Sequence, residues 1–171
     1  MRQRHRYILT TAAAGIAAIC GGPIGSSSAQ GADGPECGTF AVAMELVSGD
    51  FVDTGAEGPS PGDQRITFSN IRDQDGRQIG NRYVVAIAVP ASGGNYVLYG
   101  TLYDEFANGS VTSQAIAMPP DITVTSRSIS HDLKGAVTGG TGAFAHVSGT
   151  TSERTRDDGV REVTFDLVCH D

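Results

Sequence analysis

The chain has 171 residues, a length typical of a single domain that can bury a real hydrophobic core. It carries 12 basic and 19 acidic residues, and its formal net charge of -7 argues against nucleic acid as a partner. With 23 glycines, 7 prolines and no tryptophan, the composition favours short strands joined by turns over a helical bundle.

Residues 1–29 have the features of an export signal. Three arginines precede the short apolar run 8–19, and Ser27 and Ala29 offer small residues for cleavage after Ala29. The run is shorter than the ~20 apolar residues that a membrane-spanning helix needs, which argues against a membrane anchor. We therefore predict a signal peptide at 1–29, a secreted or extracytoplasmic location, and a mature domain at 30–171.

Two cysteines, Cys37 and Cys169, lie near the two ends of the mature domain. In an exported protein two cysteines favour a disulfide bond, and the alternative is a pair of unpaired buried thiols. If the two are paired, the bond joins the first strand to the last, as the closing of a barrel would require.

Eight stretches of the mature domain are rich in β-branched and aromatic residues and predict strands. They are 39–47, 64–71, 81–89, 96–104, 110–118, 128–137, 145–155 and 161–169. Dipeptides such as Asp75-Gly76 and Asn108-Gly109 between them are typical of tight hairpins. Because a meander of strands removes its exposed edges by closing, we predict an all-β fold, an eight-stranded antiparallel β-barrel, rather than an open sandwich. Such a barrel is wide enough to hold one small ligand.

Several motifs that resemble known sites lack an essential part. The stretch 73–77, "DQDGR", begins like a calcium loop, but Val84 stands where the bidentate glutamate belongs, so we predict a hairpin turn. The histidines have no Cys or His partner at metal-binding spacing, and "TGGTG" at 138–142 is not followed by the Gly-Lys-Ser/Thr of a phosphate-binding loop. We predict no metal and no cofactor.

One segment resembles a known family. "AVTGGTGAF" at 136–144, followed by "VSG", resembles a segment shared by plant allene oxide cyclases and dirigent proteins. Further similar stretches occur upstream in the same order, so that the resemblance covers roughly Thr39 to Val168; they are "GDQRITFSN" at 62–70, "IGNRYVV" at 79–85 and "NGSVTSQ" at 108–114. The resemblance implies a barrel in which Gly139, Gly140 and Gly142 supply unusual backbone angles at a tight turn and Phe144 plugs the interior.

The same resemblance implies site residues. In the cyclases a glutamate on the first strand stabilises positive charge as an epoxide opens, and Glu45 matches it. Asn70 matches an asparagine that holds a bound water, and Phe68 matches an aromatic residue of the pocket. Val47 and Ala86 stand where the cyclases have an asparagine and a cysteine, which argues against activity on allene oxide itself. We predict Glu45 and Asn70 as catalytic residues.

A carboxylate inside an apolar lumen needs a partner, and Arg82, which shares the inward parity of Ala86, is the candidate. Glu45 lies between Met44 and Leu46, so it faces either the lumen or, if the register slips by one residue, the outside. The predicted substrate-binding residues are Phe68, Arg82, Ala86 and Tyr96.

Two classes of function follow from these predictions. The first is an exported cyclase or isomerase that folds a small, flexible, apolar substrate in its lumen while Glu45 and Asn70 bias charge. The second is a non-catalytic barrel that binds an apolar ligand or guides the stereochemistry of a partner's product, as dirigent proteins do. We favour the first. The apolar character of both faces of the first strand, together with the family resemblance, also predicts a homo-oligomer, a trimer.

Overall fold

The computed structural model describes residues 34–55, 57, 60–92, 96–117 and 133–170. The predicted signal peptide at 1–29 lies outside the described residues. Within the described part of the chain, no helix is both long and apolar enough to cross a membrane.

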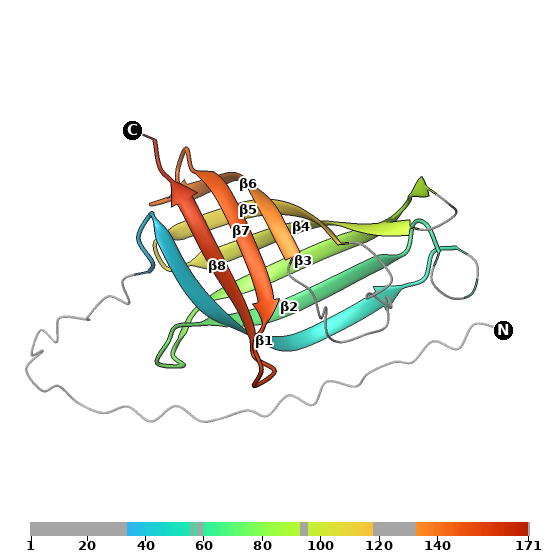
Figure 1. Cartoon of the computed structure of the whole chain (residues 1–171), viewed down its shortest axis with the longest axis horizontal. Helices are drawn as coiled ribbons and strands as arrows, with labels where there is room; N and C mark the ends of the chain where they lie inside the picture. Colours follow the sequence, from blue (N-terminus) through green and yellow to red (C-terminus); the bar gives the residue numbers. More distant parts are fainter. Residues whose placement is uncertain (1–33, 56, 58–59, 93–95, 118–132, 171) are drawn as a thin grey trace, which may run out of the picture. The chain divides into compact units, whose positions relative to one another are not determined.

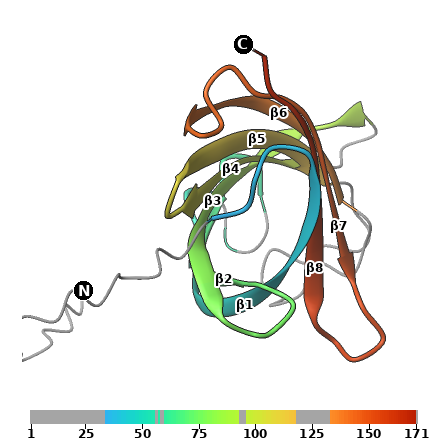
Figure 2. The ribbon, with the colours of Figure 1, turned by 90° about the vertical axis from the view of Figure 1, so that its left-hand side faces the viewer.

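The described residues form eight strands that close into a barrel (Figures 1 and 2). The strands are β1 (Thr39–Val52), β2 (Gln64–Arg72), β3 (Gln78–Pro90), β4 (Tyr96–Phe106), β5 (Gly109–Ala117), β6 (Leu133–Gly142), β7 (Ser148–Thr155) and β8 (Arg161–Val168). Each strand pairs antiparallel with the next one along the chain, and β8 pairs with β1. The predicted barrel is therefore confirmed, although β1 and β6 extend five residues beyond their predicted ends.

The closure of the barrel is held by a disulfide bond. β1 and β8 lie antiparallel with Phe40 opposite Phe165, and the N–H of Leu167 donates a hydrogen bond to the carbonyl of Gly38. Just outside this pairing, Cys37 and Cys169 form the predicted disulfide, with their Cα atoms 6.2 Å apart. The bond closes a separation of 132 residues, and so it restricts the unfolded chain strongly.

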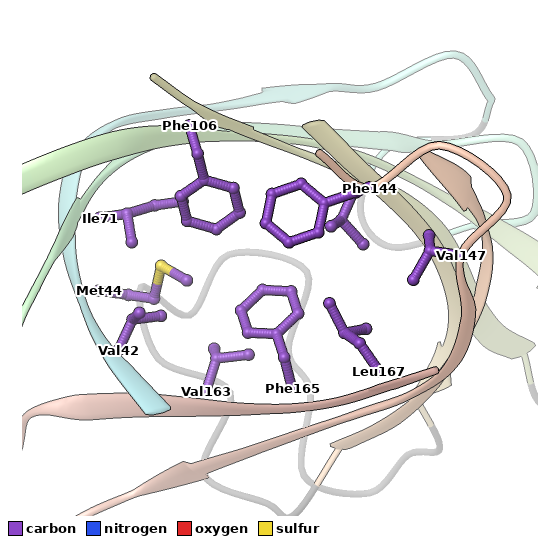
Figure 3. Close-up of a cluster of buried hydrophobic side chains, with 10 residues drawn as sticks. Val42, Met44, Ile71, Phe106, Phe144, Val147, Val163, Phe165 and Leu167 are labelled. Atoms are coloured by element: carbon purple, nitrogen blue, oxygen red, sulfur yellow. The ribbon is translucent and has the colours of Figure 1, made fainter. Parts of the chain in front are cut away.

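An apolar cluster fills the end of the lumen where β1 begins and β8 ends (Figure 3). Its centre is aromatic: the Phe40 and Phe165 rings stack with centroids 4.8 Å apart, and the Phe106 and Phe144 rings are 5.7 Å apart. Phe144 and Phe165 are completely buried, which is worth roughly 1.5–3 kcal/mol for each side chain relative to leaving it exposed. This end of the barrel is a packed core.

The glycine-rich segment leads the chain into that core. After β6, the N–H of Phe144 donates to the carbonyl of Thr141, and the turn carries the buried Phe144 ring into the cluster, as predicted. Gly142 has a φ of 62°, which favours glycine. Gly140 was expected to have a positive φ as well, and this was wrong. Glycine is needed at position 140 because the backbone of Phe144 and Ser110 packs closely against it. A Cβ atom there would lie 2.5 Å from the carbonyl oxygens of both residues.

The stretch 73–77 is the predicted hairpin turn between β2 and β3. The Asp73 carboxylate accepts hydrogen bonds from the backbone N–H groups of Asp75 and Arg77, and Gly76 has a φ of 78°. The hydrogen bonds of the Asp73 carboxylate therefore stabilise the turn.

Candidate functional site

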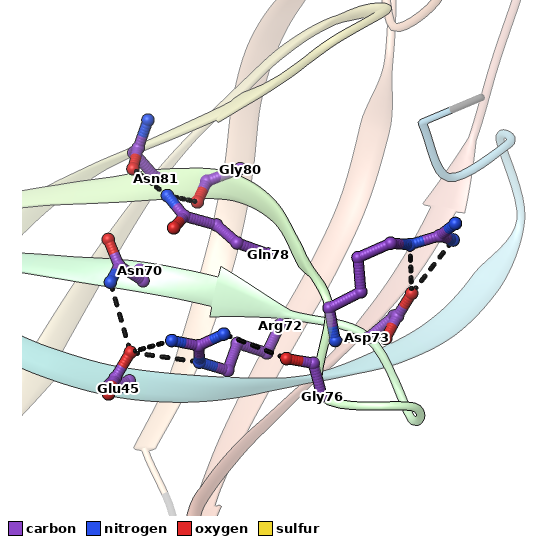
Figure 4. A network of polar contacts seen from close by, with 9 residues as sticks. Glu45, Asn70, Arg72, Asp73, Gly76, Gln78, Gly80 and Asn81 are labelled. Atoms are coloured by element: carbon purple, nitrogen blue, oxygen red, sulfur yellow. Dashed lines mark hydrogen bonds and ion pairs between the residues drawn. The ribbon is translucent and has the colours of Figure 1, made fainter. Parts of the chain in front are cut away.

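The structure places Glu45 and Asn70 on the outside of the barrel (Figure 4). The Glu45 side chain is 52% exposed, and it accepts hydrogen bonds from Asn70 Nδ2 at 3.1 Å and from Arg72 Nε at 3.0 Å. The Asn70 hydrogen bond, followed by the hydrogen bonds and charge of Arg72, lowers the pKa of Glu45. The predicted lumen positions of both residues are therefore wrong, and so is the predicted pairing of Glu45 with Arg82.

The register of β1 explains this outcome. Met44 lies opposite Ile71 and Val42 lies opposite Val163, and all four side chains are buried in the apolar cluster. Because side chains alternate along a strand, Glu45 must then point outward. A bulge between Leu46 and Ser48 leaves Val47, which was expected to face the lumen, 52% exposed.

Phe68, which was predicted to be an aromatic residue of the pocket, also lies on the outer face and not in the lumen. Its ring contacts Tyr83 with centroids 5.2 Å apart, and Tyr83 in turn lies 6.2 Å from Tyr103. Tyr83 and Tyr103 are both exposed. These three rings form an aromatic row across β2, β3 and β4 on the outside of the barrel.

The inner face of β3 supplies the predicted residues that do line the lumen. Arg82 and Ala86 both border a cavity of about 50 Å³, while Tyr96 packs beside it against the buried side chains of Ala88 and Leu98. The apolar wall of the cavity is made by Val84, Ala86, Leu98, Leu102, Ala117 and Leu133. Its polar wall is made by Arg65, Thr67, Ser69, Arg82, Glu153 and Arg161.

Arg82 is held by two buried carboxylates. Its Nε and Nη2 donate to both oxygens of Asp104 at 2.6 and 2.9 Å, and its Nη1 donates to Glu153 at 2.9 Å. Burial by itself would lower the pKa of Arg82, but the attraction of Asp104 and Glu153 outweighs this and raises it. Burial raises the pKa of Asp104, and the attraction of Arg82 opposes that shift. The bidentate geometry fixes the guanidinium plane within the barrel.

Two further arginines, Arg65 and Arg161, line the same cavity, and each has one buried nitrogen without a hydrogen-bond partner. Arg161 Nε forms an ion pair with the second oxygen of Glu153 at 2.6 Å, but Arg161 Nη2 is buried without a hydrogen-bond partner. Arg65 Nη1 is also buried and without a partner. Burial, and then repulsion from Arg161, lowers the pKa of Arg65 against the opposing attraction of Glu153. Arg65 and Arg161, which both line the cavity, therefore each have one buried nitrogen without a hydrogen-bond partner.

Sequence reasoning missed four residues of this polar wall and its support: Arg65, Asp104, Glu153 and Arg161. Arg65 alternates along β2 with Thr67 and Ser69, and these three polar residues line the lumen. The family resemblance had suggested instead that Phe68 and Asn70 face the lumen. Asp104 had a signal, because it shares the parity of Leu102 and Phe106 along β4. Among the described residues there is no group of three His, Cys, Asp or Glu side chains that could hold a metal ion.

Solved structures share this barrel. The chain is similar to a pyocyanin demethylase with a TM-score of 0.63 and 18% identity, over 76% of this chain and 99% of that one. It is similar to the Diels–Alderase AbmU from Streptomyces koyangensis with a TM-score of 0.60 and 15% identity, over 77% of this chain and 64% of that one. A third neighbour is AbnU, an exo-specific intermolecular Diels–Alderase, with a TM-score of 0.55 and 13% identity, over 75% of this chain and 96% of that one.

At sequence identities this low, the structural similarity shows a shared fold and no shared function. The chain spans just under two thirds of the length of AbmU. No protein-family model and no curated protein matches the sequence. The resemblance to allene oxide cyclases and dirigent proteins stays a prediction.

Proposed function

We propose that this protein is an exported, cofactor-independent cyclase or isomerase that binds a largely apolar substrate in its lumen. The observation that carries the proposal is the cavity, in which a wall of small and branched apolar side chains faces a buried network of charges. Pockets of this composition, mostly apolar with a few convergent polar groups, are the usual form of small-molecule sites.

The geometry suggests how such a protein would act. A confined apolar wall excludes most conformations of a flexible chain, and holding the reactive one removes entropy from the barrier. The charges of Arg82, Asp104 and Glu153 are fixed by their mutual hydrogen bonds, so they need no rearrangement when charge develops in a bound molecule. Glu153 replaces Glu45 as the carboxylate that borders the lumen.

The size of the cavity limits what it holds. About 50 Å³ admits a few water-sized groups, whereas a site for a drug-sized ligand spans roughly 300–1,000 Å³. We infer that the enclosed part binds one portion of the substrate. The remainder would lie toward the end of the barrel where β5 ends at Ala117 and β6 begins at Leu133.

Two other observations support the proposal. Two of the structural neighbours are Diels–Alderases by name, and a Diels–Alder reaction depends on bringing reacting carbon atoms together in one shape. The disulfide bond between Cys37 and Cys169 supports an extracytoplasmic location, because such bonds persist in oxidising compartments.

The test uses the fact that a cyclisation or isomerisation keeps the molecular mass. The purified protein is incubated, without added cofactor, with an organic extract of a culture of the source organism that lacks the gene, and the mixture is separated by liquid chromatography with mass detection. We expect one compound to decrease while a new compound of identical mass appears. If compounds are bound and none is converted, the protein is a ligand-binding or stereochemistry-guiding barrel instead.

A matched pair of variants tests whether the reaction takes place in the lumen. Ala86→Phe introduces a large side chain into the cavity, whereas Gln114→Phe adds a ring on the exposed outer face of β5. We expect Ala86→Phe to abolish conversion and Gln114→Phe to retain it. Equal conversion by the two variants would show that the reaction does not occur in this cavity.

The predicted homo-oligomer also remains a proposal. The exposed apolar side chains Ile66, Tyr83, Val85, Ile87 and Tyr103 share the outer face of β2, β3 and β4, and this face supports self-association better than β1 does. Light scattering at micromolar concentration should give the mass of a trimer, and the mass of a single chain would contradict the proposal.

A further inference from the structure

Two arginine nitrogen atoms in the lumen, Arg65 Nη1 and Arg161 Nη2, are buried and have no hydrogen-bond partner. Arg65 is only 8% exposed, and within the described part of the chain its side chain makes no hydrogen bond or ion pair. Leaving a buried charged group without a partner is costly, and native proteins rarely do so without a reason. Arg161, whose Nη2 also has no hydrogen-bond partner, lines the same cavity.

The charges around the cavity do not balance. Asp63 is buried too, but it lies outside the cavity lining and accepts hydrogen bonds from the backbone N–H groups of Thr54 and Ser60. Among the other described residues, the lumen arginines Arg65, Arg82 and Arg161 stand against two carboxylates, Glu153 in the lining and Asp104 bound to Arg82. Both carboxylates are already occupied, since Asp104 binds Arg82 through both oxygens and Glu153 binds Arg82 and Arg161. One positive charge is therefore left over in a region of low dielectric, where it attracts an anion strongly.

The inner face of β2 adds further donors. Thr67 and Ser69 follow Arg65 at the two-residue spacing of one strand face, and all three side chains border the cavity. Hydroxyl groups and guanidinium groups together are typical ligands of carboxylate oxygens.

We propose that Arg65 and Arg161 form a site for the carboxylate head group of an amphipathic acid whose hydrocarbon part lies on the apolar wall. The proposal rests on the proposed function, because it names the class of that lumen substrate. A cavity of about 50 Å³ accommodates a carboxylate and its first carbon atoms, in keeping with that assignment. The bound carboxylate lies beside the guanidinium groups of Arg65 and Arg161, which both line the cavity, and it neutralises the excess charge.

Three probes separate the elements of this proposal by calorimetric titration of the purified protein. Octanoate carries both the head group and the chain, 1-octanol carries the chain alone, and acetate carries the head group alone. We expect octanoate to bind roughly tenfold or more tightly than 1-octanol, as charge-assisted hydrogen bonds imply. We expect acetate to bind much more weakly than octanoate.

Arg65→Met tests the residue, because methionine is similarly long and carries no charge. The variant should lose most of the preference for octanoate while it still binds 1-octanol, which also shows that it is folded. Arg154→Met is the matched control, since Arg154 pairs with Glu162 on the outside and is 65% exposed. That variant should keep the wild-type preference.

The other outcomes are distinct. Equal binding of octanoate and 1-octanol, or an unchanged preference in Arg65→Met, would overturn the carboxylate site and leave the apolar lumen of the proposed function intact. Acetate binding as tight as octanoate binding would show a site for free small anions and would overturn the amphipathic acid. If none of the three probes binds, both this site and the proposed lumen binding fail.

Discussion

The two ends of the lumen are built in opposite ways. The end near the disulfide is filled by the rings of Phe40, Phe106, Phe144 and Phe165, which are apolar and need no hydrogen-bond partner. The other half contains buried arginines and carboxylates around a cavity, and two of its donors have no partner. Packing of the first kind stabilises a fold, whereas unpaired buried charge destabilises it. The difference supports our proposal that the charged half of the barrel binds a ligand.

A similar contrast exists between two arginines of the charged half. Arg82 has three hydrogen bonds to carboxylates and belongs to the framework of the barrel. Arg65 has none among the described residues, although it is almost as deeply buried. Removal of the first should therefore destabilise the protein, and removal of the second should not.

Phe144→Ala should have the largest effect on stability, because it empties the centre of the aromatic cluster. We expect a loss of about 3–5 kcal/mol in the free energy of unfolding, the usual range for a buried phenylalanine. Urea denaturation measures it, with Val47→Ala, at a side chain that is 52% exposed, as the control. A loss below about 1 kcal/mol would show that the cluster is not a tightly packed core.

Arg82→Met should come next, with a loss of about 3 kcal/mol, because it leaves Asp104 buried without its cation. The double variant Arg82→Met, Asp104→Leu should recover much of that loss, since it removes both charges together. If the double variant is no more stable than Arg82→Met alone, the ion pair is not the reason for the loss.

Glu45→Gln should have the smallest effect, because Glu45 is an exposed residue paired with Arg72. The pKa of Glu45 is lowered in the folded protein, first by Asn70 and then by Arg72, so its contribution is present above its ordinary pKa of 4.5. It is lost as the pH falls through the lowered value. Melting curves of the two proteins should thus differ slightly at neutral pH and coincide in strong acid. A variant that loses conversion of the lumen substrate would contradict the outward position of Glu45.

The sequence was sufficient to predict the architecture. The spacing of turn dipeptides such as Asp75-Gly76 defined the strands, and the positions of Cys37 and Cys169 indicated where the barrel closes. These features are local or depend only on chain order, and so they can be read without knowing which strand residues lie opposite one another.

The register could not be predicted from the sequence. β1 is apolar on both faces, so hydrophobic alternation does not choose between Met44 and Glu45 as the inward residue. The pairing of β2 with β3 would have shown which residues of β2 face the lumen. Ser69 lies opposite Arg82, so the two side chains share a face, and an inward Arg82 therefore excludes an inward Asn70. The polar lumen of β2 was missed because polar side chains ordinarily indicate the solvent face.

The most direct test of the account is the thermal stability of wild type and Arg65→Met, each measured without ligand and with octanoate. Without ligand, Arg65→Met should melt at the higher temperature, because it relieves an unpaired buried charge that Arg161 repels. With octanoate, wild type should gain more than the variant, because a ligand stabilises the folded state in proportion to its affinity. A variant that melts below wild type without ligand, and gains as much from octanoate, would contradict the claim that Arg65 is kept for an acidic ligand.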